Sequence, residues 1–168
     1  TPAYIETWLK HQNRDSFWKH GSICEDFSEI ECAVFAVGRW VDPYSNAIPR
    51  MLEGLSCPRK GLIGPWAHEY PMRALPGPQI GFLQECLRWW DYWLKGKDTG
   101  IMNEPMLRTW IHESGKPGGV QKERSGSWVG ENDWPSNDIN SEHFFLHQYG
   151  MSAKAQSDTI KMIHQSPL

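Results

Sequence analysis

Residues 32–42, CAVFAVGRWVD, and residues 60–68, KGLIGPWAH, decide the fold of this chain. Each begins with a short, largely apolar run, residues 32–38 and residues 60–66, that is bounded by polar residues, glycine or proline. An apolar run of this length, without polar alternation, is typical of a strand that is buried on both faces of a parallel sheet. The two segments therefore predict two strands of one such sheet.

Helices are predicted around these strands. Residues 4–19 carry apolar side chains at helical spacing and end near Gly21, a plausible helix C-cap. A short helix is predicted over residues 48–55, and the clearest one over residues 80–94, which Gly96 stops. In the last helix, Ile80, Leu83, Leu87, Trp90 and Leu94 form one apolar stripe, and Trp89, Trp90 and Trp93 are expected on the buried side. Helices that alternate with buried strands predict an α/β fold.

The pattern changes after residues 99–100. Short strand candidates follow at residues 106–112, 127–129 and 143–147, and turn-rich segments separate them. Several short strands with turns between them indicate the start of a β-sandwich. A domain boundary is therefore expected near residues 98–105, and the chain supplies fewer strands than a complete sandwich needs.

An acid and a histidine follow the two predicted strands. Asp42 comes after the first strand and His68 after the second. Sites of parallel sheets form at the carboxyl ends of the strands, and acid before histidine is the order of the α/β-hydrolase triad. In that chemistry the histidine takes the proton of a serine hydroxyl, and the acid fixes the tautomer of the histidine. Two simpler readings stay open, in which Asp42 is a turn residue before Pro43 and His68 is an exposed loop histidine.

Composition narrows the function classes. The chain has 168 residues, of which 39% are hydrophobic and 22% charged, as in globular proteins. The formal net charge of −3 gives no reason to expect nucleic acid or an anionic membrane as a partner. No apolar run approaches the roughly 20 residues of a membrane span, and no signal-peptide pattern is visible.

The cysteines and histidines show no metal pattern. The four cysteines form no CxxC pair, which favours reduced thiols and a cytoplasmic location, with a single disulfide as the alternative. His143 and His147 lie in a strand candidate, where a spacing of four residues separates them by roughly 13 Å. We therefore expect neither a metal nor a cofactor. Trp40 and Trp66 each stand two positions before a candidate site residue, so they are expected to bound a substrate pocket or else to pack in the core.

Three segments closely resemble the CocE/NonD group of serine hydrolases, which includes X-prolyl dipeptidyl-peptidases, cocaine esterase and α-amino-acid ester hydrolases. They are GRWVDPYSNAIPRMLEGL, RKGLIGPWAHEYP and GFLQECLRWWDYWLKGKDTGIMNEPMLRTW. The resemblance covers about residues 4–135, and the motifs G-x-W-x-D and G-P-W-x-H are fairly specific to the group. Proteins of this group have an α/β-hydrolase domain, an inserted helical cap and a C-terminal jelly roll.

The resemblance implies a division of the chain. Residues 1–20 would be the end of the helical cap, and residues 21–98 the C-terminal part of the α/β-hydrolase domain. Residues 104–168 would be a partial jelly roll of the galactose-binding-like type, the C-terminal domain of X-prolyl dipeptidyl-peptidases.

The resemblance also implies the site. Asp42 would be the triad acid and His68 the triad base, acting on a small ester, an amide or a short peptide. One departure is Arg39, where the group has glycine; its charge could lower the pKa of Asp42, or it could point to solvent. The sequence contains no G-x-S-x-G elbow for the nucleophile. The predicted function is therefore a serine hydrolase whose serine lies outside this chain. The alternative is a non-catalytic ligand- or partner-binding module, and a homo-oligomer is left open.

Overall fold

The computed structural model describes residues 3–116, 118, 119 and 121–155. The chain separates into two compact units, Thr1–Ser136 and Asn137–Leu168. The first unit holds the larger sheet and the helices around it, and the second holds a small hairpin. No helix among the described residues is both long and apolar enough to cross a membrane.

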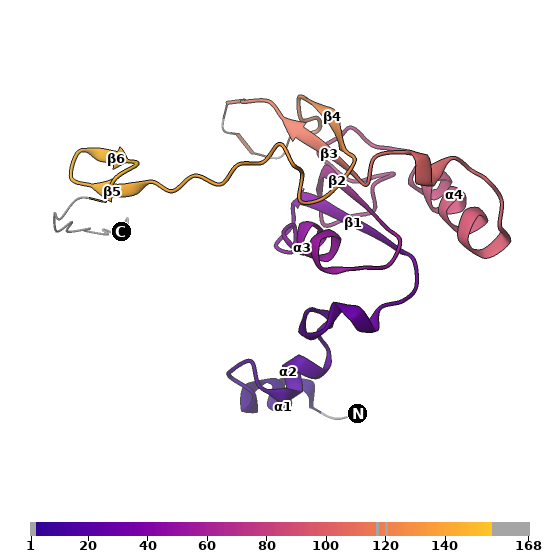
Figure 1. The fold of residues 1–168 in the computed structure, drawn as a ribbon, viewed down its shortest axis with the longest axis horizontal. Coiled ribbons are helices and arrows are strands. Elements are labelled where there is room, and N and C mark those ends of the chain that lie inside the picture. Colours follow the sequence, from indigo (N-terminus) through magenta and orange to yellow (C-terminus); the bar gives the residue numbers. More distant parts are fainter. Residues whose placement is uncertain (1–2, 117, 120, 156–168) are drawn as a thin grey trace. The chain divides into compact units, whose positions relative to one another are not determined.

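A four-stranded mixed sheet forms the centre of the first unit (Figure 1). Its strands lie in the order β1 (Val34–Val41), β2 (Arg59–Ala67), β3 (Leu107–His112) and β4 (Gly126–Glu131). The first three strands are parallel, and β4 pairs antiparallel to β3. The two predicted strands are therefore confirmed as parallel neighbours, and β2 is buried along almost its whole length.

Helix α3 (Ala47–Gly54) covers one face of this sheet. Its Ile48 and Leu52 are buried and pack with side chains of the three parallel strands, namely Ala36, Ile63 and Leu107. The helix approaches the sheet closely at two glycines. A Cβ on Gly38 would lie 2.4 Å from Cγ1 of Ile48, and one on Gly61 would lie 2.6 Å from Cδ1 of Leu52. Glycine at these positions gives the helix room to seat its apolar side chains.

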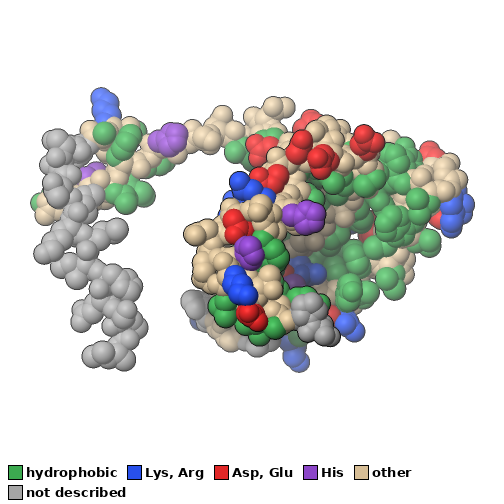
Figure 2. Space-filling view, turned by 90° about the horizontal axis from the view of Figure 1, so that it is seen from below, with side chains coloured by type: hydrophobic (Ala, Val, Ile, Leu, Met, Phe, Trp, Pro, Cys, Tyr) green, Lys and Arg blue, Asp and Glu red, His purple; other side chains and the backbone are tan. Residues whose placement is uncertain are grey.

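Helix α4 (Phe82–Lys95) covers the opposite face, where Trp89 stacks on Phe35 with ring centroids 5.4 Å apart. The predicted helix is confirmed, but the apolar stripe that includes Trp90 does not lie on the buried side. Trp89 is 2% exposed, whereas the residues of that stripe within the helix are mostly exposed: Leu83, Leu87, Trp90 and Leu94. The helix has a second apolar row at the same spacing, Phe82, Cys86, Trp89 and Trp93, whose members are buried or partly buried. Figure 2 shows hydrophobic side chains gathered over the side of this unit on which α4 lies.

The N-terminal helix is shorter than the sequence predicts. Two helices, α1 (Tyr4–Lys10) and α2 (Ser16–His20), replace the single helix expected over residues 4–19. Asp15 starts the second one, because its side chain accepts a hydrogen bond from the N–H of Phe17 at 3.0 Å. Two 3-10 turns, η1 (Ile23–Glu25) and η2 (Phe27–Glu29), follow before β1.

The later strands differ in part from the expected sandwich. The 3-10 turn η3 (Ile101–Asn103) leads into β3, and β3 and β4 join the sheet of β1 and β2. The strands through residue 131 thus belong to one mixed sheet, and the domain boundary expected near residues 98–105 stays a prediction. The second unit contains the antiparallel hairpin of β5 (Phe145–His147) and β6 (Gly150–Ser152). The jelly roll itself stays a prediction.

Candidate active site

The candidate acid and base lie side by side because two parallel strands end together. Val41, the last residue of β1, pairs with Ala67, the last residue of β2. Asp42 and His68 are the residues that come next in each strand. The register shifts between Arg39 and Val41, and this irregularity brings the two strand ends level.

Asp42 and His68 are in direct contact. Nδ1 of His68 lies 2.6 Å from Oδ2 of Asp42, the distance of a short charge-assisted hydrogen bond. Since an ionised carboxylate can only accept, the proton of a neutral imidazole is assigned to Nδ1, which leaves Nε2 with a free lone pair. Asp42 is nearly buried, with its side chain 5% exposed, whereas that of His68 is 73% exposed. The pair therefore has a fixed acid and an accessible base.

The second oxygen of Asp42 also has a partner. Oδ1 accepts a hydrogen bond from the backbone N–H of Tyr44 at 2.9 Å, which is the turn role that the sequence left open. The N–H of Tyr44, the ring of His68 and the guanidinium of Arg39 lower the pKa of Asp42 from 3.8 to about 2. Asp42 is thus ionised over the whole physiological range. The turn contact and the contact with His68 occur together, each on its own oxygen of Asp42.

Arg39 lies against both residues. Its Nη1 donates to Oδ2 of Asp42 at 2.8 Å and lies 3.2 Å from Nδ1 of His68. Because Nδ1 already donates to Asp42, the approach of Arg39 to it is electrostatic rather than a hydrogen bond. The sequence left open whether Arg39 lowers the pKa of Asp42 or points to solvent. In the structure it contacts Asp42 and lowers its pKa.

The two tryptophans have different places. Trp40 is 40% exposed, and its indole N–H reaches across β2 to donate to the carbonyl oxygen of Trp110 at 2.6 Å. Trp66 is fully buried, and its N–H donates to the carbonyl oxygen of Pro78 at 2.8 Å. Trp40 lines a pocket, as described next, and Trp66 packs in the core next to Leu62 and Ala74.

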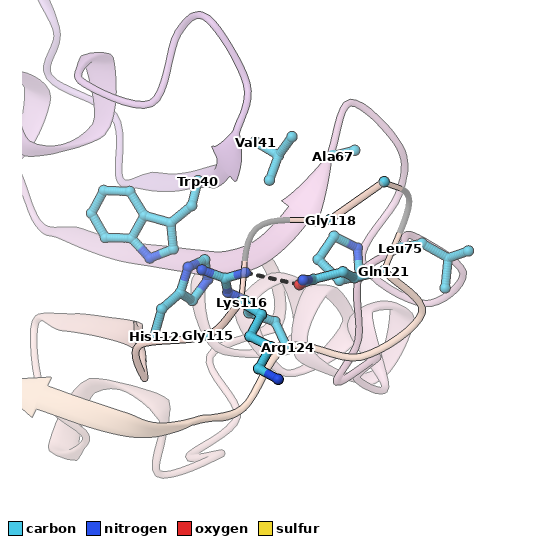
Figure 3. Close-up of a pocket in the computed structure, with 12 residues that line it drawn as sticks. Trp40, Val41, Ala67, Leu75, His112, Gly115, Lys116, Gly118, Gln121 and Arg124 are labelled. Atoms are coloured by element: carbon cyan, nitrogen blue, oxygen red, sulfur yellow. Dashed lines mark hydrogen bonds between the residues drawn. The ribbon is translucent and has the colours of Figure 1, made fainter.

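Two hollows open at this end of the sheet. One, of about 220 Å³, is lined by Arg39, His68, Glu69 and Tyr70, so the imidazole of His68 faces it. The other, of about 730 Å³, is shown in Figure 3. It is lined in part by Trp40, Val41 and Ala67 from the strand ends, and it continues to side chains near β3 and β4, among them His112, Gln121 and Arg124.

These last residues were not found from the sequence. His112 lies in the strand candidate of residues 106–112, and residues 116–119 belong to a turn-rich segment after it. No motif marks them, because they reach the pocket through the pairing of β3 with β2 and β4. In the described part of the chain, no group of three or more His, Cys, Asp or Glu side chains is placed to hold a metal.

A comparison with protein families matches the N-terminal part of the chain. The model of the X-Pro dipeptidyl-peptidase (S15) family matches residues 1–70, the segment that contains both Asp42 and His68. Two curated relatives, putative serine esterases of Mycobacterium bovis and Mycobacterium tuberculosis, are each 36% identical to this chain over 87 residues. That alignment covers 48% of this chain and 14% of each relative.

Solved structures resemble the fold as well. Two crystal structures of a CocE/NonD family hydrolase from Staphylococcus aureus match with TM-scores of 0.65 and 0.67, each at 11% identity. The matches cover 88% and 91% of this chain, but only 24% and 26% of those chains. In sequence over its N-terminal part and in fold over most of its length, the chain resembles a CocE/NonD-type serine hydrolase.

Proposed function

We propose that this chain supplies the acid and the base of a Ser-His-Asp triad in a hydrolase of ester, amide or peptide bonds. The observation that carries the proposal is the 2.6 Å contact between Oδ2 of Asp42 and Nδ1 of His68 at the ends of adjacent parallel strands. The proposal assigns Asp42 to holding the tautomer of His68 and to stabilising the imidazolium that forms during the reaction.

The free side of His68 supports this role. Among the described residues, His68 contacts only Asp42 and Arg39 through hydrogen-bonding atoms, so Nε2 has no protein partner. In the proposed reaction Nε2 takes the proton of a serine hydroxyl as that oxygen attacks the scissile carbonyl, and returns the proton to the leaving group. The sequence holds no G-x-S-x-G elbow, so the proposal takes the serine and the oxyanion donors from a part of the protein outside these residues.

The triad test uses the full-length protein and a para-nitrophenyl ester. Asp42→Asn and His68→Ala should each lower kcat by roughly 10⁴, as triad lesions do. The double variant should lose little more than His68→Ala alone, because the residues act as one unit.

Two matched controls separate catalysis from structure. Asp26→Asn removes an aspartate that also accepts from a backbone N–H two residues on, that of Ser28, but has no histidine partner. His20→Ala removes another exposed histidine. Both controls should keep full activity. Near-normal turnover in the Asp42 and His68 variants would refute the proposed triad.

The 168-residue chain alone should be inactive, because it contributes no nucleophilic elbow. A serine-directed fluorophosphonate should therefore label the full-length protein rapidly and the isolated chain no faster than a protein without an active serine. Rapid labelling of the isolated chain would show that a serine within these residues is the nucleophile.

A second candidate function is a non-catalytic binding module. The observations that favour it are the absence of a G-x-S-x-G elbow from the sequence and the presence of Arg39, whose Nη1 lies 3.2 Å from Nδ1 of His68. The variant Arg39→Gly, which introduces the glycine of the CocE/NonD group, distinguishes the two candidates. A hydrolase should keep turnover in that variant, whereas a binding module should show no turnover before or after the change.

We also propose the type of bond that is hydrolysed, the location of the protein and its need for a cofactor. The S15 family match favours a dipeptidyl-peptidase that acts on Xaa-Pro bonds, whereas the mycobacterial relatives favour an esterase. Hydrolysis of Xaa-Pro amides against simple esters would decide between them. We also propose a cytoplasmic location, a small-molecule or short-peptide substrate, and no cofactor.

A further inference from the structure

The larger pocket lies directly beside the proposed acid and base. Two residues that line it, Val41 and Ala67, immediately precede Asp42 and His68. The pocket has a volume of about 730 Å³ and begins one residue before each of them in the chain, although neither Asp42 nor His68 is among its lining residues. The lining of the pocket therefore bears on which substrates the proposed hydrolase accepts.

Trp40 and Val41 from β1 and Ala67 from β2 form an apolar wall of the pocket. Leu75 and Pro76, from the loop after β2, add apolar lining beside Gln121 (Figure 3). The indole of Trp40 is held by its hydrogen bond to the carbonyl oxygen of Trp110. A fixed aromatic and aliphatic wall of this kind favours a hydrocarbon segment of the ligand.

The facing wall is polar and carries positive charge. Lys116, Gln121 and Arg124 line it together with His112, and no aspartate or glutamate is among the described residues that line the pocket. Figure 3 shows His112 and Arg124 on the other side of the pocket from Val41 and Ala67. Within the described part of the chain, neither Lys116 nor Arg124 has a carboxylate partner within salt-bridge distance.

Arg124 is held in place without being neutralised. Its Nη1 donates to Oε1 of Gln121 at 2.8 Å, and its backbone N–H donates to the carbonyl oxygen of Gly77 at 3.1 Å. Among the described residues, neither its buried Nε nor the buried Nε2 of His112 has a hydrogen-bond partner.

His112 is kept neutral at this wall. Burial and the nearby charge of Arg124 lower the pKa of its imidazole below the ordinary value of 6.5. At neutral pH the positive charge of the wall therefore comes from Arg124 and Lys116. The uncharged imidazole can then donate or accept one hydrogen bond beside them.

We infer that this pocket binds the carboxylate of the substrate, and that the proposed hydrolase prefers esters or amides in which an apolar spacer separates the scissile carbonyl from a carboxylate. The carboxylate would bind Arg124, whose guanidinium can pair with both of its oxygens. The spacer would lie on Trp40 and Val41. This inference rests on the proposed function, because it names the substrate class of that site.

The test compares two chromogenic esters of equal chain length in the full-length protein. Mono-para-nitrophenyl adipate carries a terminal carboxylate, and para-nitrophenyl hexanoate ends in a methyl group. The expected ratio of kcat/KM, adipate over hexanoate, is about ten or more, which is the scale of one charge-assisted hydrogen bond. Arg124→Gln should bring the ratio close to one, and Arg50→Gln, which removes an exposed arginine of α3, should leave it unchanged.

Two results of this comparison would overturn the inference. A wild-type ratio near or below one would overturn the inference, as would an unchanged ratio in Arg124→Gln. Should Arg124→Gln prove misfolded by circular dichroism, Lys116→Gln should lower the same ratio, and an unchanged ratio there would overturn the inference.

Failure of the proposed function would be visible separately, as hexanoate hydrolysis that is absent or that survives His68→Ala. In that case calorimetry with monomethyl adipate and methyl hexanoate decides about the pocket alone. Tighter binding of the monoanion, lost in Arg124→Gln, would support the carboxylate site, and equal affinity for the two compounds would overturn it.

Discussion

The contact between α3 and β2 predicts a measurable coupling between two core positions. Leu52 is fully buried, and a Cβ built on Gly61 would lie 2.6 Å from its Cδ1 and 3.0 Å from Cδ1 of Leu107. Leu52→Ala opens a cavity at this point, whereas Gly61→Ala overfills it. The double variant places the new methyl group partly in the space that Leu52 vacates.

The magnitudes follow from these contacts. Leu52→Ala should lower the free energy of unfolding by about 3 kcal/mol or more, as expected for a fully buried leucine whose site cannot collapse. Gly61→Ala should cost about 1–3 kcal/mol, the usual range for overpacking. The double variant should be at least about 1 kcal/mol more stable than the two single effects together would make it, because the clash with Leu52 is gone.

Urea unfolding followed by tryptophan fluorescence measures all four proteins of this cycle. Gly130→Ala is the matched control, because its Cβ would lie 2.6 Å from Cγ of Pro105 and meets no atom of Leu52 among its nearest neighbours. Its effect should add to that of Leu52→Ala. Additivity within about 0.5 kcal/mol for the pair Leu52 and Gly61 would refute the packing described here.

Two further predictions concern α4 and the acid. Trp89→Ala should destabilise the protein by about 3–5 kcal/mol, because the ring is buried against Phe35, whereas Trp90→Ala, on the exposed row, should change stability by less than about 1 kcal/mol in the isolated chain. Urea midpoints would check this, and a larger loss for Trp90→Ala would contradict the placement of the helix. Because the pKa of Asp42 is lowered from 3.8 to about 2 in the folded chain, its ionised form stabilises the fold above pH 3.8. This contribution is lost as the pH falls toward about 2, so the stability gap between the wild type and Asp42→Asn should narrow over that interval; a gap that does not change with pH would contradict the assigned contacts.

The helices and strands that depend on local sequence patterns were the most predictable. The apolar runs of β1 and β2, the short α3 and the span of α4 all follow from local patterns, because the period of apolar residues reflects the geometry of a strand or a helix. The helix break at Asp15 was missed, since a capping side chain competes with the helical pattern around it. The buried face of α4 was predicted only in part: Trp89 is buried as expected, but the apolar stripe that includes Trp90 is exposed. Two apolar rows run along that helix, and only the sheet selects between them.

The candidate site divides in the same way. The sequence by itself determined that Asp42 and His68 stand at the ends of two successive buried strands, because strand ends and site residues are local features. Only the tertiary structure decided that Val41 pairs with Ala67 and so brings Asp42 to 2.6 Å from His68, that Arg39 turns toward the acid, and that Trp40 and Arg124 face one pocket. Those contacts depend on strand register and on pairing between distant segments, and neither leaves a periodic signal in the chain.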